Sequence, residues 1–227
     1  MTDASPKSTA QQYWEGFYQE RDGAGDGAGG RGGKPNGLLV REAGALTAGT
    51  ALDLGCAEGA DAMWLAERGW QVTAVDVSGT ALRRGAARAA EAGLAERIDW
   101  QRHDLSQSFP AGVFDLVSAQ FLHSPVATPG EREQILRRAA DAVAPGGVLL
   151  ITGHAGWPSW QDVPPFDHHF PTTREVLESL GLAPGEWHVE AEDVVNRDLT
   201  APDGRPGTRQ DNVLRVRRAA AGPSSVR

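Results

Sequence analysis

Residues 51–59 read Ala-Leu-Asp-Leu-Gly-Cys-Ala-Glu-Gly, and this stretch decides the fold. A short apolar strand over 51–54 runs into a turn with small residues at 55, 57 and 59, and an Ala- and Leu-rich helix is predicted over 60–68. Small residues let the backbone approach a ligand, and the start of a helix presents free N–H groups. The stretch therefore predicts a strand–turn–helix unit that binds a ligand.

The alternation of strand and helix continues towards the C-terminus. Further strands are predicted over 71–77, 98–102, 114–120 and 148–152, and further helices over 79–92 and 131–143. Ser78 can cap one helix at its start, and Gly69 can end another. Nearly continuous apolar strands separated by helices indicate a parallel sheet covered on both faces. We expect a Rossmann-like, doubly wound α/β domain with five parallel strands.

The pattern changes after the fifth strand. Residues 154–171 form a long irregular loop rich in proline, histidine and aromatic residues, and loops of this length are usually functional or disordered. Thr172 and Glu175 predict a capping box for a helix that ends at residue 180. Two strands, 188–197 and 212–217, are joined by a polar loop over 200–211 and predict an antiparallel hairpin at the edge of the sheet. A small, polar tail over 219–227 is expected to be disordered.

An N-terminal segment, 1–37, precedes the main domain, which we place at 38–218. It contains an aromatic stretch over 13–18 and a Gly-rich linker over 22–33. Because the linker has no apolar periodicity, it cannot offset its ordering entropy and is expected to be flexible. The linker is either passive or a hinge that lets a helical, aromatic lid close over a site.

Composition excludes several classes of function. The 227 residues contain 22 Lys and Arg against 30 Asp and Glu, so the net charge is −8, which disfavours nucleic acid and anionic membranes as partners. No apolar run approaches the roughly 20 residues of a membrane-spanning helix, and the first residues show no apolar signal core. A single cysteine excludes an intrachain disulfide framework. We expect a cytoplasmic protein, with monomer and homodimer both open.

Two acidic residues select the ligand. Asp76 ends the second predicted strand 23 residues after Asp53, about where a carboxylate binds the ribose of a nucleoside. Asp53 stands two residues before Gly55, where it would repel a pyrophosphate and attract an ammonium group. A nucleoside with an ammonium group and no phosphate is S-adenosylmethionine. The alternatives are a dinucleotide, glycines that serve only helix–sheet packing, and an Asp76 that only caps a helix.

Five motifs in register resemble those of class I S-adenosylmethionine-dependent methyltransferases, over roughly residues 11–218. They are 53–59, Asp76, 103–105, 114–117 and 144–147. Within that class the chain is most similar to the tellurite-resistance and thiopurine S-methyltransferase group, through residues 13–14, 35–36, 62–70 and 153–154. The resemblance implies methyl transfer to a small-molecule acceptor, with S-adenosylhomocysteine as the second product.

The resemblance also implies a set of cofactor-binding residues. In chain order they are Asp53, Gly55, Cys56, Ala57, Gly59, Asp76, Val77, Asp104, Leu105 and Gln120. Residues 53–59 would hold the methionine end, Asp76 the ribose, and Val77, Asp104 and Leu105 the adenine, while Gln120 would line the methyl-transfer channel. Ala57 departs from the commoner glycine, and alanine is the mildest such replacement. For Asp104 the alternative is a surface turn residue.

Aromatic residues and histidines indicate the acceptor site. The candidate substrate or lid residues are Tyr13, Trp14, Tyr18, Phe121, Trp157 and Trp160. His123 and His154 follow strands at the edge where open α/β sheets bind ligands, so each is either a general base or a hydrogen-bonded loop histidine. No metal is expected, because residues 167–169 lack further ligands at a recognisable spacing.

Three functions remain open at this point. An aromatic enclosure favours a thiol or another soft nucleophile as methyl acceptor, and such an acceptor needs no strong base. A hydroxyl or amine acceptor would need a histidine base. The third alternative is a protein that binds S-adenosylmethionine without transferring its methyl group.

Overall fold

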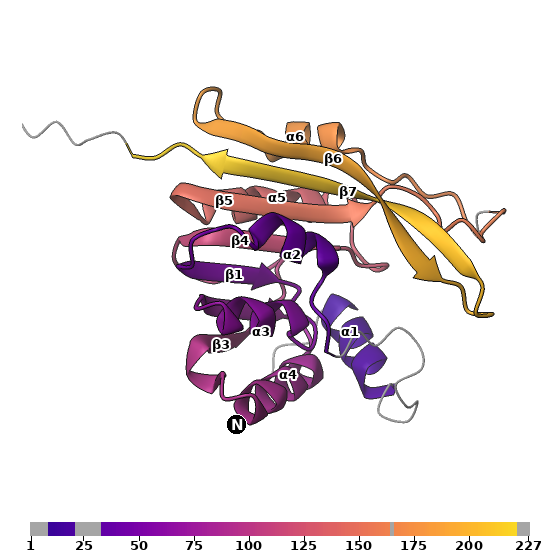
Figure 1. Cartoon of the computed structure of the whole chain (residues 1–227), viewed down its shortest axis with the longest axis horizontal. Helices are drawn as coiled ribbons and strands as arrows, with labels where there is room; N and C mark the ends of the chain where they lie inside the picture. The colour runs from indigo at the N-terminus through magenta and orange to yellow at the C-terminus, as the bar shows by residue number, and fades with distance from the viewer. Residues whose placement is uncertain (1–8, 21–32, 164–165, 222–227) are drawn as a thin grey trace, which may run out of the picture.

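A computed structural model describes residues 9–20, 33–163 and 166–221 and has a seven-stranded sheet at its centre, in the order β3-β2-β1-β4-β5-β7-β6. The parallel strands are β1 (Thr50–Leu54), β2 (Gln71–Asp76), β3 (Ile98–Arg102), β4 (Phe114–Gln120) and β5 (Val143–His154). The antiparallel strands are β6 (Trp187–Thr200) and β7 (Pro206–Arg218). The predicted α/β fold with a C-terminal edge hairpin is confirmed (Figure 1).

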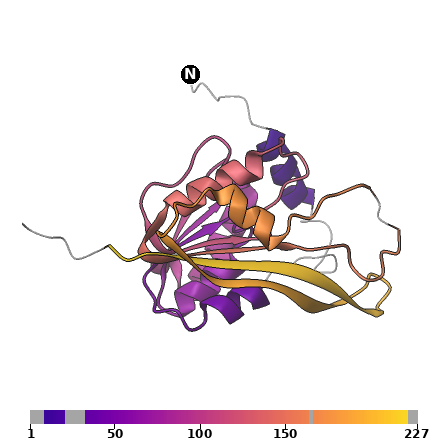
Figure 2. The same ribbon diagram turned by 90° about the horizontal axis from the view of Figure 1, so that it is seen from above.

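Helices cover both faces of this sheet (Figure 2). One face carries α2 (Gly37–Ala43), α3 (Ala60–Glu67) and α4 (Gly79–Glu91), with a short 3₁₀ turn, η1 (Ala95–Arg97), before β3; the other carries α5 (Glu131–Asp141) and α6 (Thr173–Leu180). Successive residues of a strand point to opposite faces. In β1, Leu52 and Leu54 therefore join the core under α5 and α6, while Ala51 joins the core under α3. The two faces of β1 are therefore both buried in a hydrophobic core.

Three predicted helix ends are confirmed by their capping contacts, whereas the helix predicted over 131–143 ends at Asp141 and the strand predicted over 148–152 already begins at Val143. The Ser78 side chain accepts the N–H of Ala81 at 3.2 Å and so caps α4. Thr172 and Glu175 form the capping box of α6. Gly69 follows α3 with φ of +92°, a left-handed conformation that ends a helix at little cost for glycine. Local sequence signals thus place the helices that position the site.

The predicted polar loop over 200–211 is wrong in most of its length. β6 and β7 pair from Trp187 opposite Arg218 to Thr200 opposite Pro206, with one register shift between Val189 and Ala191, which leaves only 201–205 as the turn. Proline and glycine at 206 and 207 suggest a loop, but the missing N–H of Pro206 falls on the first residue of β7, where it removes no interior hydrogen bond. The hairpin is therefore an arm that reaches beyond the rest of the sheet (Figure 1).

The segment that follows β5 runs along this arm. The N–H of Ala155 donates to the carbonyl of Gln210 at 2.9 Å, and the N–H of Ser159 donates to the carbonyl of Thr208 at 2.8 Å. A Cβ on Gly207 would overlap the ring of Trp160, so the glycine allows close packing between arm and loop. The arm therefore supports the aromatic loop predicted from the sequence.

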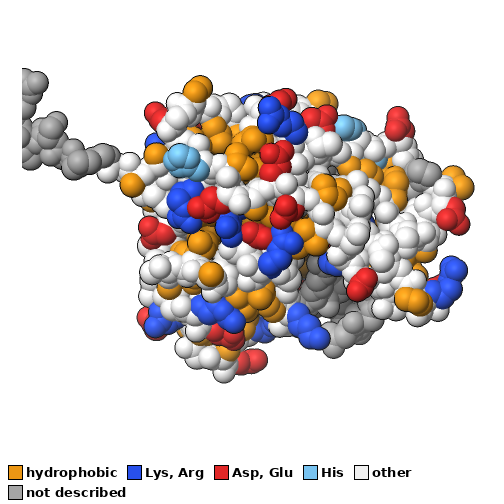
Figure 3. All heavy atoms as spheres, turned by 45° about the horizontal axis from the view of Figure 1, so that its top comes forward, with side chains coloured by type: hydrophobic (Ala, Val, Ile, Leu, Met, Phe, Trp, Pro, Cys, Tyr) orange, Lys and Arg blue, Asp and Glu red, His pale blue; other side chains and the backbone are white. Residues whose placement is uncertain are grey.

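The predicted N-terminal lid is a helix, α1 (Thr9–Glu20), which lies at the carboxyl ends of the parallel strands and packs on α4 (Figure 1). The rest of the predicted segment up to residue 32, with almost all of the Gly-rich linker, lies outside the described residues, as does 222–227 of the predicted tail. Within the described ranges, no helix is both long and apolar enough to cross a bilayer. Acidic and basic side chains are interspersed on the face shown in Figure 3.

Candidate active site

The turn between β1 and α3 has three residues in the left-handed conformation: Gly55 (φ +68°), Ala57 (φ +53°) and Gly59 (φ +78°). A Cβ on Gly55 would lie 2.8 Å from Cδ1 of Leu122, and a Cβ on Gly59 would overlap the ring of Trp100. Both positions therefore require glycine. Ala57 accepts the conformation at a cost of roughly 1–2 kcal/mol.

Asp76, at the end of β2, fixes this turn. Its Oδ2 accepts the N–H of Ala57 at 3.0 Å, and its Oδ1 accepts the N–H of Ser78 at 2.9 Å. Burial raises the pKa of Asp76, and these N–H donors act against the rise. Each carboxylate oxygen can accept a second hydrogen bond, and the side chain lines a cavity. Asp76 is thus placed to bind hydroxyl groups, as the sequence predicted for a ribose.

Asp53 lies beneath the turn and is 2% exposed. Its Oδ2 has no hydrogen-bond partner among the described residues. Burial raises the pKa of Asp53 well above its ordinary value, and the nearby carboxylates of Asp61 and Asp76 raise it further. A buried acidic cluster of this kind is stabilised by a cation. The ammonium group of a methionine moiety is a cation of suitable chemistry.

A cavity of about 420 Å³ opens above the turn. Seven predicted cofactor residues line it: Gly55, Ala57, Asp76, Val77, Asp104, Leu105 and Gln120. Asp53, Cys56 and Gly59 lie below the wall rather than on it. Burial raises the pKa of the Cys56 thiol well above its ordinary value, which fits a packing residue. The volume is within the range of about 300–1,000 Å³ that is usual for small-molecule sites.

Two side chains predicted to contact the cofactor, Asp104 and Gln120, also accept hydrogen bonds from other residues of the protein. Asp104 accepts from the N–H and the hydroxyl of Ser106, at 3.1 and 2.6 Å, so it stabilises a turn as well as lining the cavity. The Oε1 of Gln120 accepts from Asn36 at 3.1 Å and from Thr152 at 3.0 Å. Gln120 is therefore held rigidly at the end of β4.

Helix α1 closes the cavity from the solvent side. The indole of Trp14 donates to Oγ of Ser124 at 3.2 Å, and the carbonyl of Tyr18 accepts from Arg84 at 2.8 Å. The Glu15 carboxylate accepts from the hydroxyls of Ser78 and Thr80, at 2.9 and 2.7 Å. Burial opposes ionisation of Glu15, but these hydrogen bonds outweigh it and lower its pKa to about 2. Trp14 and Tyr18 line the cavity, as expected of lid residues.

A second cavity, of about 870 Å³, adjoins the first. Eight residues line both cavities and are called the junction below: Trp14, Phe121, Leu122, His123, Ser124, Ala127, Arg132 and His154. The other walls of the second cavity are rich in rings: Tyr13, Trp157, Phe166, His168, His169 and Phe170. Trp160, the remaining predicted substrate residue, lines neither cavity and packs against Gly207 instead. The second cavity is therefore an aromatic compartment that meets the first at the junction.

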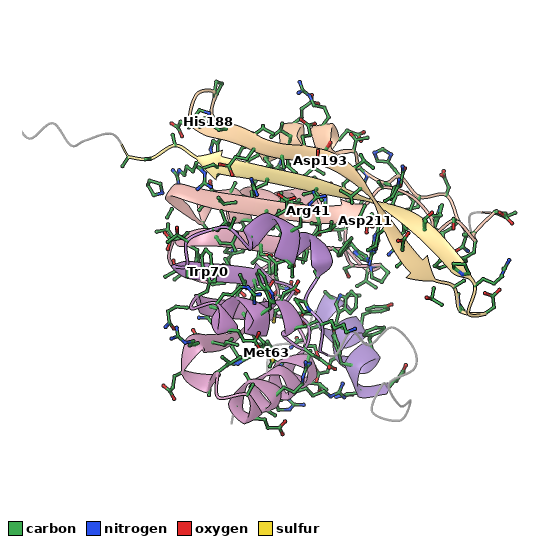
Figure 4. All side chains as sticks on the ribbon, in the orientation of Figure 1. Arg41, Met63, Trp70, His188, Asp193 and Asp211 are labelled. Carbon is green, nitrogen blue, oxygen red and sulfur yellow. The ribbon has the colours of Figure 1, made fainter. Side chains whose placement is uncertain are left out.

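His154 belongs to a buried ionic network at the junction. Its Nδ1 lies 2.8 Å from Oδ1 of Asp211, which is fully buried on β7 directly opposite His154 on β5 (Figure 4). Nε of Arg197 donates to the other carboxylate oxygen at 2.5 Å. Burial alone would raise the pKa of Asp211, but hydrogen bonds from His154 and Arg197 hold it below its ordinary value. Asp211 is therefore an ionised acceptor for an N–H of His154.

His123 is oriented by the backbone. Its Nδ1 lies 2.6 Å from the carbonyl oxygen of Phe121, and a carbonyl can only accept, so Nδ1 carries the proton. Burial lowers the pKa of both His123 and His154 below the usual 6.5. Phe121 itself has φ of +52°, an uncommon conformation for a bulky residue, and its ring lies 4.6 Å from that of His154. The junction is thus a rigid site with two neutral histidines.

Sequence reasoning missed three groups of this site. Asp211 stood in a stretch read as a loop, and its pairing with His154 depends on the β5–β7 register. Arg132 lies in a predicted helix and carries no motif that marks it. Asp61 follows Gly59 by two residues, and its carboxylate accepts the N–H of Asn36 at 2.6 Å, a contact that the sequence does not reveal. The described residues contain no cluster of three or more side chains able to hold a metal.

Comparison with known proteins finds a family match for the region that contains β1 to the start of β5. Residues 51–147 match the family described as "Methyltransferase domain". A ubiquinone biosynthesis O-methyltransferase from Caulobacter sp. (strain K31) is 37% identical over 102 residues, which are 44% of this chain and 38% of that protein. The chain thus spans well under two thirds of the relatives it matches.

Solved structures match over nearly the whole chain. The structure reported for conversion of a disulfide bond into a thioacetal group during echinomycin biosynthesis has a TM-score of 0.71 at 21% identity, covering 94% of this chain and 93% of that one. N-methyltransferase NodS from Bradyrhizobium japonicum WM9, in complex with S-adenosyl-L-homocysteine, gives 0.62 at 20% identity, covering 88% and 97%. TehB from Haemophilus influenzae is also similar in fold, at 18% identity, and does not establish the tellurite-resistance subgroup.

Proposed function

We propose that this chain, whose residues 51–147 form an S-adenosylmethionine-dependent methyltransferase domain, transfers the methyl group of that cofactor to a hydroxyl oxygen of a small aromatic molecule. The observation that carries the proposal is the His154–Asp211 pair at the junction of the two cavities. A histidine backed by a buried carboxylate is an arrangement suited to removing a proton. A hydroxyl is the common acceptor group that needs this help.

The residues of the first cavity fit the cofactor. The unpartnered Oδ2 of Asp53 and the neighbouring Asp61 would favour the ammonium group, and Asp76 offers carboxylate lone pairs to two ribose hydroxyls. The left-handed turn at Gly55 leaves room for a ligand where a side chain would collide with Leu122. When bound, the cofactor supplies a methyl group activated by its positively charged sulfur.

His154 would act as the base through Nε2. Because the Asp211 carboxylate only accepts hydrogen bonds, the ring proton of His154 lies on Nδ1, and the lone pair on Nε2 is free. Burial lowers the pKa of His154 in spite of Asp211, so the ring is neutral near pH 7. When the ring takes a proton, the adjacent carboxylate stabilises the resulting charge.

The chemical step balances with these groups alone. The acceptor O–H proton passes to Nε2 of His154, the acceptor oxygen forms a bond to the methyl carbon, and the carbon–sulfur bond of the cofactor breaks. The electron pair of that bond stays on sulfur. The protein contributes alignment and exclusion of water, and Trp14 of α1 and Phe121 lie where they can do both.

The second cavity supports an aromatic acceptor. Trp157 meets Phe166 and Phe170 edge to face, with ring centroids 5.1 and 5.2 Å apart, so its walls present both ring faces and ring edges. One relative is named "Ubiquinone biosynthesis O-methyltransferase". Another, from Oryza sativa subsp. japonica, is named as a probable tocopherol O-methyltransferase. Those names support oxygen as the acceptor atom here.

A thiol or other soft acceptor is the second candidate. The apolar, ring-rich walls favour it, because a polarizable sulfur loses little by leaving water. The resemblance to the tellurite-resistance and thiopurine S-methyltransferase group supports this second candidate. Such an acceptor makes no use of the His154–Asp211 pair, which is why we rank it second.

The test is His154→Gln, measured as release of S-adenosylhomocysteine with a panel of phenols, aliphatic alcohols, amines and thiols. We expect phenols to turn over in the wild type and the variant to lose at least about a hundredfold in kcat. Affinity for S-adenosylhomocysteine should change little. The matched control is His188→Gln, on β6 at the far end of the hairpin from Asp211 (Figure 4).

The outcomes separate the candidates. Turnover of simple thiols, with most of the rate retained in His154→Gln, would favour the soft acceptor. Binding of S-adenosylhomocysteine without turnover of any acceptor would indicate a binding protein. For a histidine base the pH dependence of kcat/KM also has a fixed sign: the rate falls as pH decreases through the pKa of His154, and burial places that fall below pH 6.5.

A further inference from the structure

Arg132 is the only junction residue that carries a formal charge when both histidines are neutral. It lies in the first turn of α5 and is half-buried. Its Nε donates to the carbonyl of Leu122 at 2.9 Å, which turns the guanidinium towards the loop between β4 and α5. A cation is therefore held where the two cavities meet.

No carboxylate among the described residues forms an ion pair with Arg132. Other partly buried arginines of the fold are paired: Arg197 with Asp211 and Arg215 with Glu42. Of the neighbouring acids, Glu131 is engaged by the N–H and hydroxyl of Thr128, at 3.1 and 2.9 Å, and Glu133 acts on Arg132 only through space. Burial of a charge without a partner is unfavourable. The Arg132 side chain lines both cavities, so an anion bound in either of them could supply the partner.

The cofactor would bring a second positive charge to the same place. Its sulfur must lie near the junction, because the methyl group has to pass from the first cavity to the second. The Arg132 guanidinium and the sulfonium of the cofactor would repel each other, and an anion bound between them would attract both. A neutral acceptor would leave the guanidinium and the sulfonium opposed.

We infer that the acceptor reacts as an oxyanion paired with Arg132. This rests on the proposed function and narrows its substrate class to ring hydroxyls acidic enough to ionise in the site, such as phenols and enols. His154 takes the O–H proton, and Arg132 stabilises the oxygen that loses it. The new C–O bond forms as the S–CH₃ bond breaks. The methylated oxygen and the sulfur of the product are then both neutral, so the attraction between oxyanion and sulfonium is gone when the products leave.

A different anion could also pair with the Arg132 guanidinium: the carboxylate at the methionine end of the cofactor. The junction favours the acceptor, because Arg132 lines the aromatic cavity as well as the first and lies beside His123, whose pKa its charge helps to lower after burial. The experiment below separates the two sources by measuring cofactor and acceptor affinity independently.

The experiment uses the full chain saturated with S-adenosylhomocysteine and 4-nitrophenol as the acceptor probe, because the absorbance of this phenol reports its ionisation directly. Titration of the bound probe gives its pKa in the site. We expect the wild type to bind the phenolate and to lower the probe's pKa. Arg132→Gln should weaken phenolate binding about tenfold or more, as loss of a charge-assisted hydrogen bond does, and Arg132→Lys should retain most of the effect.

Arg137→Gln is the matched control: it removes an arginine from the same helix, where Nη1 donates to the Ser179 carbonyl away from both cavities. A structural role for Arg132 would affect Lys and Gln variants alike and leave the bound probe's pKa unchanged, which overturns the inference. A tenfold loss of S-adenosylhomocysteine affinity with unchanged phenolate affinity also overturns it and assigns Arg132 to the cofactor. Since the probe is read without turnover, failure of methyl transfer would refute the proposed function separately.

Discussion

Asp76 shows how much one side chain can organise. Its two oxygens bind the N–H groups of Ala57 and Ser78, so one carboxylate joins the β1–α3 turn to the start of α4. The same carboxylate lines the first cavity. The geometry of the turn and one wall of the cavity therefore depend on a single group.

Replacement of Asp76 by Ala should weaken binding of S-adenosylhomocysteine more than tenfold. Each lost hydrogen bond between a charged group and a ribose hydroxyl contributes roughly 1.5–3 kcal/mol, and the turn loses its anchor as well. Isothermal calorimetry measures the affinity. Asp141→Ala, at the exposed end of α5, should bind as the wild type does; equal affinity in Asp76→Ala would show that the carboxylate does not contact the ribose.

At the residue scale, the sequence predicts the part of the candidate site that is local along the chain. Gly55 and Asp76 belong to motifs with fixed spacing, and the turn between β1 and α3 follows from residues that are neighbours in the chain. Asp211 could not be predicted in this way. Its partner His154 is 57 residues away, and only the register of β5 against β7 brings the two together.

At the scale of elements, α1 is held over the site by side-chain contacts to two separate parts of the domain. Glu15 reaches the residues that begin α4, and Trp14 reaches the loop after β4, so the helix spans the opening of the first cavity. Its aromatic residues pack on each other as well as on the domain, with Trp14 and Phe17 rings 5.3 Å apart. Such an element can separate from the domain without unfolding it.

Glu15→Gln should release α1. The folded pKa of Glu15, about 2, is below its ordinary 4.5, so its contribution to docking is complete above pH 4.5 and is lost as pH falls towards 2. Hydrogen exchange over residues 9–20 at neutral pH should be faster in the variant, and the wild type should approach it on acidification. Glu20→Gln, an exposed position on the same helix, is the control; identical exchange in both variants would contradict the role of Glu15.

Element boundaries were predictable where a cap marks them and were wrong where pairing decides them. Ser78, Thr172 and Gly69 end or begin helices through local contacts. The hairpin strands are longer than their apolar pattern, because β6 and β7 satisfy each other's backbone groups beyond the sheet. The polar residues and glycines of 200–211 therefore predicted a loop where most residues lie in strands.

On the scale of the whole molecule, the active site combines the two ends of the chain. Helix α1 closes the first cavity, and the hairpin arm supports the loop that carries Trp157 and Phe170 into the second. No described residue of the arm lines the cofactor cavity, and the arm reaches it only at the junction, where Asp211 contacts His154 and Arg197 lies over the ring of Phe121. Damage to the arm should therefore affect the acceptor side alone.

Gly207→Ala tests this separation. The new Cβ would overlap Trp160, and overpacking of this kind costs about 1–3 kcal/mol, so the loop should move from the arm. We expect a higher KM for the acceptor with unchanged affinity for S-adenosylhomocysteine. Gly156→Ala, in the same loop but with open space around the added Cβ, should behave as the wild type. A parallel loss of both affinities would mean that the arm supports the whole site.

The position of β7 between β5 and β6 has a consequence for the order in which a growing chain acquires its chemistry. Every residue that lines the first cavity has been synthesised once residue 154 is added to the chain. Asp211 follows much later, and until β7 enters the sheet, β5 has an open edge and His154 has no carboxylate behind it. A nascent chain can therefore assemble the first cavity before it completes the His154–Asp211 pair that we propose as the base.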